Sequence, residues 1–379
     1  MTTSQSAPLA AETRSATVFT ADDPLPLRGG STLGPVTVAY ETYGTLNDDR
    51  SNAVYICHAL TGDAHAAGFH DGDDRPGWWD KMIGPGKPID TDRWFVVCSN
   101  ILGGCQGTTG PASIDPATGE PYGLDFPLLH MEDFVEVHRA LARHLDIPRF
   151  AAIVGGSLGG MQVLQWSLSY PEEMGRALIF AASSRLTAQN IAFSAVGRQA
   201  IMRDSGFNEG KFLTRGTAPR KGLAVARMMA HITYLSEEAF QEKFGRQAQQ
   251  GELQPNFGVD FAVESYLEHQ GQRFLSRFDA LSYLYLTRVM DYFDPFSTEN
   301  WAEALRQHPV RFLIVSFDSD WRFSTEHSRR IVRHLEGARL STTFRDIHST
   351  WGHDSFLLDI PEYLETVEAY LDRAWEELR

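Results

Sequence analysis

Ser157 is the residue of this sequence whose type and neighbours best suit nucleophilic chemistry. It stands in the stretch GGSLGG, directly after the small and β-branched run 149–156 and before a stretch with helical character. A strand that turns straight into a helix through G-x-S-x-G forms a nucleophile elbow, in which a strained turn projects the serine hydroxyl above the sheet. The neighbours of such a serine must lack side chains, and four glycines provide this: Gly155, Gly156, Gly159 and Gly160. The alternative is a glycine-rich turn that only packs a helix against a strand.

A serine nucleophile also needs a histidine base and an acid that orients this base, and here we expect the chain order serine, acid, histidine. Asp320 lies in a loop that follows the predicted strand RFLIVSF, and His353 comes shortly after the last predicted strand, 340–347. Each residue therefore comes at the end of a strand, where a side chain can reach the serine. We predict the triad Ser157–Asp320–His353, with Asp318 and His348 as the alternative acid and base.

The stretch HALTGDAHAAGFHDGDD, residues 58–74, contains side chains that could bind a metal ion. They are His58, Asp63, His65, His70 and Asp71. Their spacing matches neither HExxH nor a paired-ligand pattern, so we predict no metal site here.

The same stretch follows the predicted strand 52–60, which is where a site of this kind places one oxyanion-hole amide. Leu60 or Thr61 would donate that N–H, and Leu158, directly after the nucleophile, would donate the other. Each such donor stabilises a tetrahedral oxyanion by about 3 kcal/mol.

Short apolar runs alternate with helical patterns along most of the chain. Apolar strands separated by a helix predict a parallel sheet covered on both faces. Strands are predicted at 36–44, 52–60, 93–100, 149–156, 177–183, 310–320 and 340–347, and helices at 130–147 and 361–378.

The segment 186–296 carries helical patterns without a convincing strand. We therefore predict an α/β core formed by residues 21–185 and 297–379, interrupted by a helical lid over 186–296. Residues 1–20 lack the basic start and apolar centre of a signal peptide, and we expect them to form a disordered or loosely docked tail.

Composition excludes several classes of partner and location. A net charge of −15 over 379 residues argues against nucleic acid or an anionic membrane as a general partner. The chain has no run of about 18 apolar residues that could span a membrane. Its three cysteines, Cys57, Cys98 and Cys105, form no CxxC motif and suit free thiols in a reducing cytoplasm.

Four blocks of the chain together resemble the homoserine O-acyltransferases of the α/β-hydrolase superfamily. The resemblance extends from about residue 30 to the C-terminus and implies an α/β-hydrolase fold with an inserted helical lid. It also implies a ping-pong transfer, through an acyl-serine, from an acyl-CoA co-substrate to the hydroxyl of L-homoserine in methionine biosynthesis. No bound cofactor is implied, and a homodimer through the lid is expected. The blocks are HALTGDAH, GWWDKMIGPGKPIDTDRWFVVCSNILGGCQGTTGP, GGSLGGMQVLQW and GHDSFL.

The resemblance also implies roles for residues outside the triad. Asp354 matches the residue that binds the homoserine amino group, and Arg227 matches the arginine that holds the carboxylate. Arg227, His231 and Tyr234 fall at i, i+4 and i+7, one stripe on an otherwise apolar helix, so we include Tyr234 in the substrate site. Because arginine is rarely buried without a partner, a carboxylate ligand suits Arg227. A salt bridge to a neighbouring helix is the alternative.

Arg322 is the residue that indicates which acyl donor the protein uses. Family members that use acetyl-CoA tend to have an apolar residue two positions after the triad aspartate, whereas this position resembles the succinyltransferases. A guanidinium is a natural partner for the terminal carboxylate of succinyl-CoA, and a surface arginine is the alternative. Gly156 and Leu158 depart from the Asn and Met of serine O-succinyltransferases. We therefore predict homoserine O-succinyltransferase activity. Homoserine O-acetyltransferase is the main alternative, followed by a serine O-succinyltransferase, an esterase or a non-catalytic binding protein.

Overall fold

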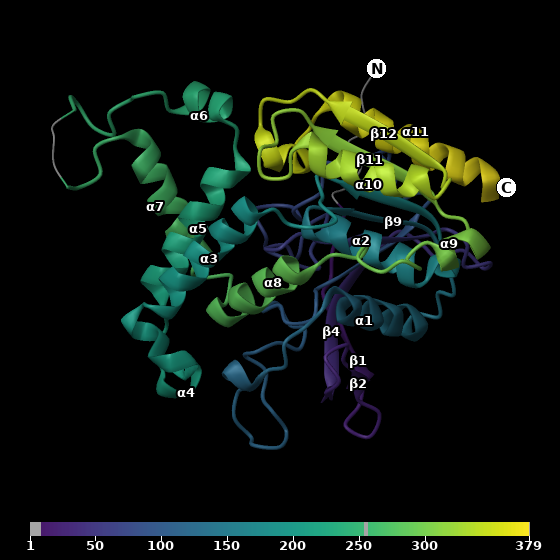
Figure 1. Cartoon of the computed structure of the whole chain (residues 1–379), viewed down its shortest axis with the longest axis horizontal. Helices are drawn as coiled ribbons and strands as arrows, with labels where there is room; N and C mark the ends of the chain where they lie inside the picture. Colours follow the sequence, from purple (N-terminus) through teal and green to yellow (C-terminus); the bar gives the residue numbers. More distant parts are fainter. Residues whose placement is uncertain (1–8, 254–256, 379) are drawn as a thin grey trace.

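The computed structural model describes residues 9–253 and 257–378, and a single eight-stranded sheet lies at its centre (Figure 1). The strand order is β1-β4-β8-β5-β9-β10-β11-β12, and all neighbours from β8 to β12 run parallel, while β1 and β4 pair antiparallel at one edge. This confirms the predicted α/β-hydrolase fold with its mostly parallel sheet. The strands are β1 (Arg14–Phe19), β4 (Val36–Tyr43), β5 (Ala53–Cys57), β8 (Phe95–Ser99), β9 (Phe150–Gly156), β10 (Met174–Phe180), β11 (Arg311–Phe317) and β12 (Thr342–Ile347).

Helices cover both faces of this sheet, which explains why its central strands are apolar throughout rather than alternating. One face packs against α1 (Met131–His144), α2 (Leu158–Ser169) and α10 (Thr325–Gly337). The other face packs against α11 (Pro361–Leu378), through residues such as Tyr363 and Val367. Every residue of β5 and β9 is buried as a result. Two small ribbons lie outside the main sheet: β2 (Leu25–Pro26) with β3 (Thr32–Leu33), and β6 (Ile83–Gly84) with β7 (Ile89–Asp90).

The chain between β10 and β11 is helical, and α5 packs against both α3 and α7. Figure 1 shows α3, α4, α5, α6 and α7 to one side of the sheet, whereas α9 lies on the other side, next to α2. An isolated bridge pairs Ala248 with Phe261 between α6 and α7. The helices are α3 (Ala188–Met202), α4 (Phe212–Arg215), α5 (Arg220–Tyr234), α6 (Glu237–Lys243), α7 (Ala262–Phe274), α8 (Ala280–Tyr292) and α9 (Glu303–Gln307).

The N-terminal segment differs from the tail expected for residues 1–20. Arg14–Phe19 forms β1 at the edge of the main sheet, with Ala16 opposite Val38, and Ala16 is buried. The backbone N–H of Ala11 also donates a hydrogen bond of 2.9 Å to the carbonyl of Phe69. The expectation was therefore wrong for this part, whereas residues 1–8 lie outside the described residues. Across 9–253 and 257–378, every helix is too short or too polar to span a lipid bilayer.

Candidate active site

Ser157 occupies the turn between β9 and α2, and its backbone is held in an unusual conformation. Its φ of 57° and ψ of −123° lie outside the ordinary regions for a non-glycine residue, and such strain is characteristic of functional sites. The serine N–H donates to the carbonyl of Phe180 at 2.9 Å, which ties the turn to the end of β10. The predicted nucleophile elbow is therefore present.

The glycines around Ser157 are required by close approaches of backbone and side chain. A Cβ on Gly159 would lie 2.0 Å from the carbonyl oxygen of Cys57, at the end of β5. A Cβ on Gly156 would lie 2.3 Å from the ring of Phe356, which belongs to the turn η4 (Gly352–Leu357). These contacts bring the ends of β5, β9 and η4 together at Ser157, so the glycines assemble the site as well as allow the turn.

A continuous chain of hydrogen bonds links the three predicted triad residues. His353 Nε2 lies 2.9 Å from Ser157 Oγ, and His353 Nδ1 lies 2.7 Å from Asp320 Oδ2. The other carboxylate oxygen of Asp320 accepts the backbone N–H groups of Arg322 and Phe323, each at 2.9 Å, and these bonds fix its orientation. All three triad residues are buried.

The alternative acid and base pair with each other instead. His348 Nδ1 lies 2.7 Å from Asp318 Oδ2, and the side chains of His348 and Asp318 are 80% and 44% exposed. This surface pair faces solvent, so the geometry selects Asp320 and His353 as the partners of Ser157.

The predicted oxyanion-hole residues lie beside the serine. Leu60 and Thr61 line the same pocket as Ser157 and form a turn closed by a hydrogen bond of 3.0 Å from Gly62 N–H to Ala59 carbonyl. Leu158 is the first residue of α2, where backbone N–H groups have no partner within the helix. Within the described ranges, the N–H groups of Leu60, Thr61 and Leu158 donate no hydrogen bond, so they are available to an oxyanion.

His58 fixes the loop that carries Leu60 and Thr61. It is 1% exposed, its Nδ1 lies 2.7 Å from the carbonyl of Ala59, and its Nε2 accepts the N–H of Ile101 at 3.0 Å. Gln162 of α2 donates to the carbonyl of His58 at 3.0 Å. Sequence reasoning considered His58 only as a metal ligand and missed this positioning role.

A pocket of about 320 Å³ opens above Ser157, between the sheet and the helical segment. It includes the predicted site residues Leu60, Thr61, Arg227, Tyr234, Arg322, His353 and Asp354, together with Asp63, Trp78, His231 and Arg277. Core and helical segment both contribute, because Ser157 and His353 come from the core while Arg227 and Tyr234 come from α5. Asp63 and Trp78 fall within the blocks HALTGDAH and GWWDKM that carry the resemblance but were given no role in the pocket, and Arg277 lies in a segment without a recognisable motif.

Arg227 and Asp354 bring opposite charges to this pocket. The Nη1 of Arg227 donates to Thr61 Oγ1 at 3.3 Å, its Nε is buried without a partner, and its guanidinium lies 4.7 Å from the Phe274 ring centroid. In the described chain, no carboxylate lies within 4.0 Å of this guanidinium, which excludes the expected alternative of an interhelical salt bridge there. Burial raises the pKa of Asp354 to about 6.

Arg322 is buried rather than on the surface. It is 7% exposed, its Nη1 donates to Thr233 Oγ1 at 2.6 Å, and its guanidinium lies 5.5 Å from the Tyr234 ring centroid. Its carbonyl accepts a hydrogen bond from Asn190 at 2.8 Å. The surface alternative is therefore wrong, and Arg322 is a buried cation that faces the pocket.

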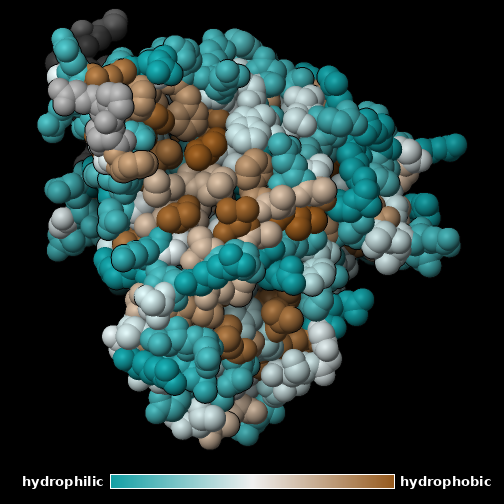
Figure 2. All heavy atoms as spheres, turned by 60° about the vertical axis from the view of Figure 1, so that its left-hand side comes forward, coloured by the Kyte–Doolittle hydropathy of each residue, from teal (hydrophilic) through white to brown (hydrophobic). Residues whose placement is uncertain are grey.

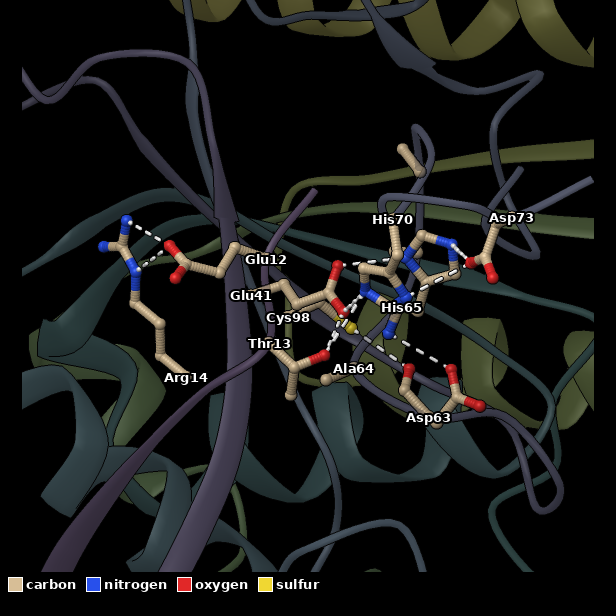
Figure 3. A network of polar contacts seen from close by, with 12 residues as sticks. Glu12, Thr13, Arg14, Glu41, Asp63, Ala64, His65, His70, Asp73 and Cys98 are labelled. Carbon is tan, nitrogen blue, oxygen red and sulfur yellow. Dashed lines mark hydrogen bonds and ion pairs between the residues drawn. The ribbon is translucent and has the colours of Figure 1, made fainter. Parts of the chain in front are cut away.

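The histidines of residues 58–74 do not gather as a single cluster. His65 and His70 meet Glu41 of β4 (Figure 3), while His58 lies elsewhere and Asp71 is not among these contacts. In the part of the chain that is described, Glu41, His65 and His70 form the only group of three metal-ligand types whose donor atoms lie within 4.8 Å.

The geometry of Glu41, His65 and His70 is that of a hydrogen-bonded carboxylate. His65 Nδ1 lies 3.1 Å from one oxygen of Glu41, and His70 Nε2 lies 2.8 Å from the other. The two imidazole rings stack, with their centroids 3.9 Å apart. Thr13 and Tyr43 each donate a further bond of 2.7 Å. We interpret this network as a tie between β4, the N-terminal segment and the loop beside the pocket.

Comparisons with known proteins agree with this geometry. Residues 52–359 match the family model of the alpha/beta hydrolase fold. A homoserine O-succinyltransferase from Nocardioides sp. is 56% identical over 360 residues, which cover 95% of this chain and 98% of that protein. A homoserine O-acetyltransferase from Rhodospirillum rubrum is 54% identical, covering 93% and 91%.

Among solved structures, homoserine O-acetyltransferase from Bacillus anthracis superposes with a TM-score of 0.86 at 29% identity, covering 95% of this chain and 97% of that one. The strained serine, its hydrogen-bonded histidine and aspartate, and the charged pocket thus occur in a chain whose relatives share its full architecture. The chain belongs to the homoserine O-acyltransferase family of the α/β-hydrolase fold.

Proposed function

We propose that this protein transfers a succinyl group from succinyl-CoA to the hydroxyl of L-homoserine through an acyl-Ser157 intermediate. The observation that carries this proposal is the joint presence of a nucleophile and a zwitterion site in one pocket. Ser157 is hydrogen-bonded to His353 at 2.9 Å, and the same pocket contains Arg227 and Asp354. Relatives that are 56% and 54% identical carry the names homoserine O-succinyltransferase and homoserine O-acetyltransferase.

In the first half-reaction, His353 Nε2 accepts the proton of Ser157 as the serine oxygen attacks the thioester carbonyl. The N–H groups of Leu158 and of Leu60 or Thr61 stabilise the resulting oxyanion. The tetrahedral intermediate collapses, the carbon–sulfur bond breaks, and His353 gives its proton to the departing CoA thiolate. Asp320 holds the imidazole in orientation through its 2.7 Å hydrogen bond.

In the second half-reaction, the homoserine hydroxyl replaces the serine hydroxyl. His353 removes its proton, the hydroxyl oxygen attacks the acyl-serine carbonyl, and Ser157 regains its proton as the ester product forms. Arg227 binds the carboxylate of homoserine and Asp354 binds its ammonium group, with Tyr234 beside them. These contacts place the hydroxyl at the acyl carbon, which explains why homoserine competes successfully with water.

Arg322 supports succinyl-CoA as the donor. Its buried guanidinium has no carboxylate within 4.0 Å among the described residues, and a succinyl carboxylate would provide this partner. An acetyl group would leave the cation unpaired, which costs free energy in a buried site. Homoserine O-acetyltransferase stays the second candidate because the Rhodospirillum rubrum relative carries that name.

Incubation with succinyl-CoA or acetyl-CoA, and with L-homoserine, L-serine or no acceptor, tests these assignments. We expect O-succinylhomoserine as the main product, CoA release that depends on homoserine, and a succinyl adduct on Ser157 when no acceptor is present. Continued CoA release without acceptor would identify a hydrolase. Faster formation of O-acetylhomoserine would identify an acetyltransferase, and O-succinylserine would identify a serine acyltransferase.

We also propose that residues 186–296 act as the lid of the pocket and form the interface of a homodimer. Val225 and Ile232 of α5 and Val196 of α3 are 47%, 39% and 48% exposed. Figure 2 turns this side of the molecule forward and shows apolar residues gathered among polar ones. A cytoplasmic location, in methionine biosynthesis, is consistent with the three free cysteines and with an acyl-CoA co-substrate.

A further inference from the structure

Arg277 is a pocket residue to which neither the sequence nor the resemblance assigns a role. It lies in the connection between α7 and α8, and its side chain lines the pocket together with Ser157 and Arg227. Its Nη2 donates to the backbone carbonyl of Thr61 at 3.0 Å. Thr61 Oγ1 accepts from Arg227 at 3.3 Å, so two guanidinium groups converge on one residue.

The backbone of Arg277 is fixed by its surroundings. The carbonyl of Arg277 accepts hydrogen bonds from Gln106 and from the thiol of Cys105. Phe274 and Phe278 on either side of it are buried. The guanidinium is therefore presented to the pocket from a well-anchored segment, which is what a ligand-binding side chain requires.

The two arginines bring positive charge to the pocket without a direct ion pair, and the carboxylates of Asp63 and Asp354 line the same pocket at longer range. Within residues 9–253 and 257–378, no carboxylate lies within 4.0 Å of the guanidinium of Arg277 or Arg227. Desolvation, and then the charge of Arg227, lower the pKa of Arg277. Arg277 is exposed and Arg227 is half-buried, and two neighbouring guanidinium groups repel each other unless an anion binds between them.

We propose that Arg277 is the second arginine of the acceptor site and, together with Arg227, binds the carboxylate of the amino acid. This inference rests on the proposed function. A carboxylate can accept hydrogen bonds from two guanidinium forks at once, since each of its oxygens has two acceptor positions. Arg227 comes from α5 and Arg277 follows α7, so a carboxylate between them would connect two parts of the helical segment.

The position of Thr61 favours the acceptor over the phosphates of CoA. Thr61 stands in the turn that is expected to provide an oxyanion-hole N–H, so Arg277 lies close to the reacting carbonyl. In homoserine, only a short side chain separates the attacking hydroxyl from the carboxylate. In CoA, the whole pantetheine arm separates the thioester sulfur from the phosphates. The acyl carboxylate has a different partner in Arg322, which is anchored on Thr233.

The experiment separates the two half-reactions and removes the carboxylate from the acceptor. Acylation is followed as CoA release from succinyl-CoA without acceptor. The isolated acyl-enzyme is then reacted with L-homoserine or with 3-aminopropan-1-ol, which keeps the hydroxyl and amine but has no carboxylate. The variants are Arg277→Gln, the charge-retaining Arg277→Lys, and Arg273→Gln as a matched control, because Arg273 is exposed on α7 and does not line the pocket.

We expect Arg277→Gln to slow the reaction of acyl-enzyme with homoserine by about 10- to 100-fold, the effect of one charge-assisted hydrogen bond to a carboxylate. The loss is confined to homoserine, so the preference for homoserine over 3-aminopropan-1-ol shrinks by the same factor. Arg277→Lys should retain part of this preference, and Arg273→Gln should match the wild type.

Two patterns of loss would overturn the proposal. Equal slowing of acylation and of both acceptors would mean that Arg277 only positions the Thr61 turn. Slowing of acylation alone would mean that it binds CoA. A wild-type acyl-enzyme that reacts no faster with homoserine than with 3-aminopropan-1-ol would refute the proposed function itself. This outcome is measured on the wild-type protein alone, and it would also refute the proposed role of Arg277.

Discussion

Arg322 is the residue on which the choice between a succinyl and an acetyl donor depends. Its guanidinium is held by Thr233 at 2.6 Å and is almost completely buried. A desolvated arginine–carboxylate contact is worth about 2–3 kcal/mol, or about 30- to 150-fold in rate. We expect Arg322→Leu to lose this factor in kcat/KM for succinyl-CoA while activity with acetyl-CoA is kept or increased. A wild-type preference for acetyl-CoA, or an unchanged ratio in the variant, would contradict this assignment.

Asp354 gives homoserine binding a dependence on pH. Burial raises its pKa from 3.8 to about 6, so the carboxylate that would bind the ammonium group is fully ionised only above this pH. We expect KM for homoserine to rise as pH falls through about 6, and Asp354→Asn to have a high KM at every pH. The Asp354 effect is confined to the second half-reaction, because acylation does not involve homoserine. Acylation measured in parallel over the same pH range is the control, and an identical pH profile for both half-reactions would exclude Asp354 as the source.

At the scale of elements, the turn between β9 and α2 depends on the absence of side chains. A Cβ at Gly159 would lie 2.0 Å from the carbonyl oxygen of Cys57, which belongs to β5 and cannot move without disrupting the sheet. We expect Gly159→Ala to lower the free energy of unfolding by about 1–3 kcal/mol or more. Gly337→Ala is the matched control, because nothing lies within 4 Å of a Cβ there. Equal unfolding midpoints in urea for both variants would refute the proposed clash.

Through its hydrogen bonds, Glu41 of β4 connects the N-terminal segment with the loop that follows β5. Burial alone would raise its pKa, but hydrogen bonds from His65, Tyr43, Thr13 and His70 lower it from 4.5 to about 2. Since the folded-state pKa lies below the unfolded value, this group stabilises the fold above about pH 4.5. That stabilisation, about 3 kcal/mol, is lost as pH falls toward about 2.

We therefore expect Glu41→Gln to lower the free energy of unfolding at neutral pH and to flatten its dependence on pH below about 4.5. Glu12→Gln serves as the control, because Glu12 lies in the same segment with a side chain 76% exposed. The measurement is chemical denaturation across this pH range. Parallel curves for the wild type and Glu41→Gln would contradict the assignment.

The main sheet was predictable from sequence wherever strands are buried on both faces. The run at 149–156 corresponds to β9, whose seven residues are all buried, because continuous burial leaves a continuous apolar signal. β1 was missed because RSATVF is partly exposed at the sheet edge and reads as polar. Ser157, Asp320 and His353 follow the ends of predicted strands. Their closeness in space could therefore be predicted from the sequence.

Contacts between distant segments were not predictable in the same way. Arg277 follows a helix in a stretch without periodicity, and nothing in its neighbours indicates that it reaches Thr61. Glu41 meets His65 and His70 only because β4 lies beside the loop after β5, a neighbourhood that tertiary structure alone creates. The sequence shows the two histidines, but the carboxylate that organises them could not be inferred from it.

At the scale of the whole molecule, the pocket differs in charge from the chain as a whole. The chain carries a net charge of −15, while Arg227, Arg277 and Arg322 line the pocket at Ser157. The carboxylate of homoserine and the terminal carboxylate of the succinyl group can thus each bind a local cation despite the overall negative charge. Core and helical segment of the chain both contribute to this pocket.

The exposed apolar face of α5 leads to a test of the proposed dimer. Val225 and Ile232 lie at i and i+7 on α5, so they share an exposed apolar face that a second copy would cover. We expect Val225→Asp to shift the protein from dimer to monomer in sedimentation velocity, while Ile114→Asp, a control at a residue 57% exposed in another segment, leaves the dimer intact. Because the hydrogen bonds that link Ser157, His353 and Asp320 form within one chain, the folded monomer should still form the acyl-Ser157 intermediate. A wild-type protein that sediments as a monomer would refute the dimer. A monomeric variant that is folded but cannot be acylated would instead show that the partner subunit shapes the lid.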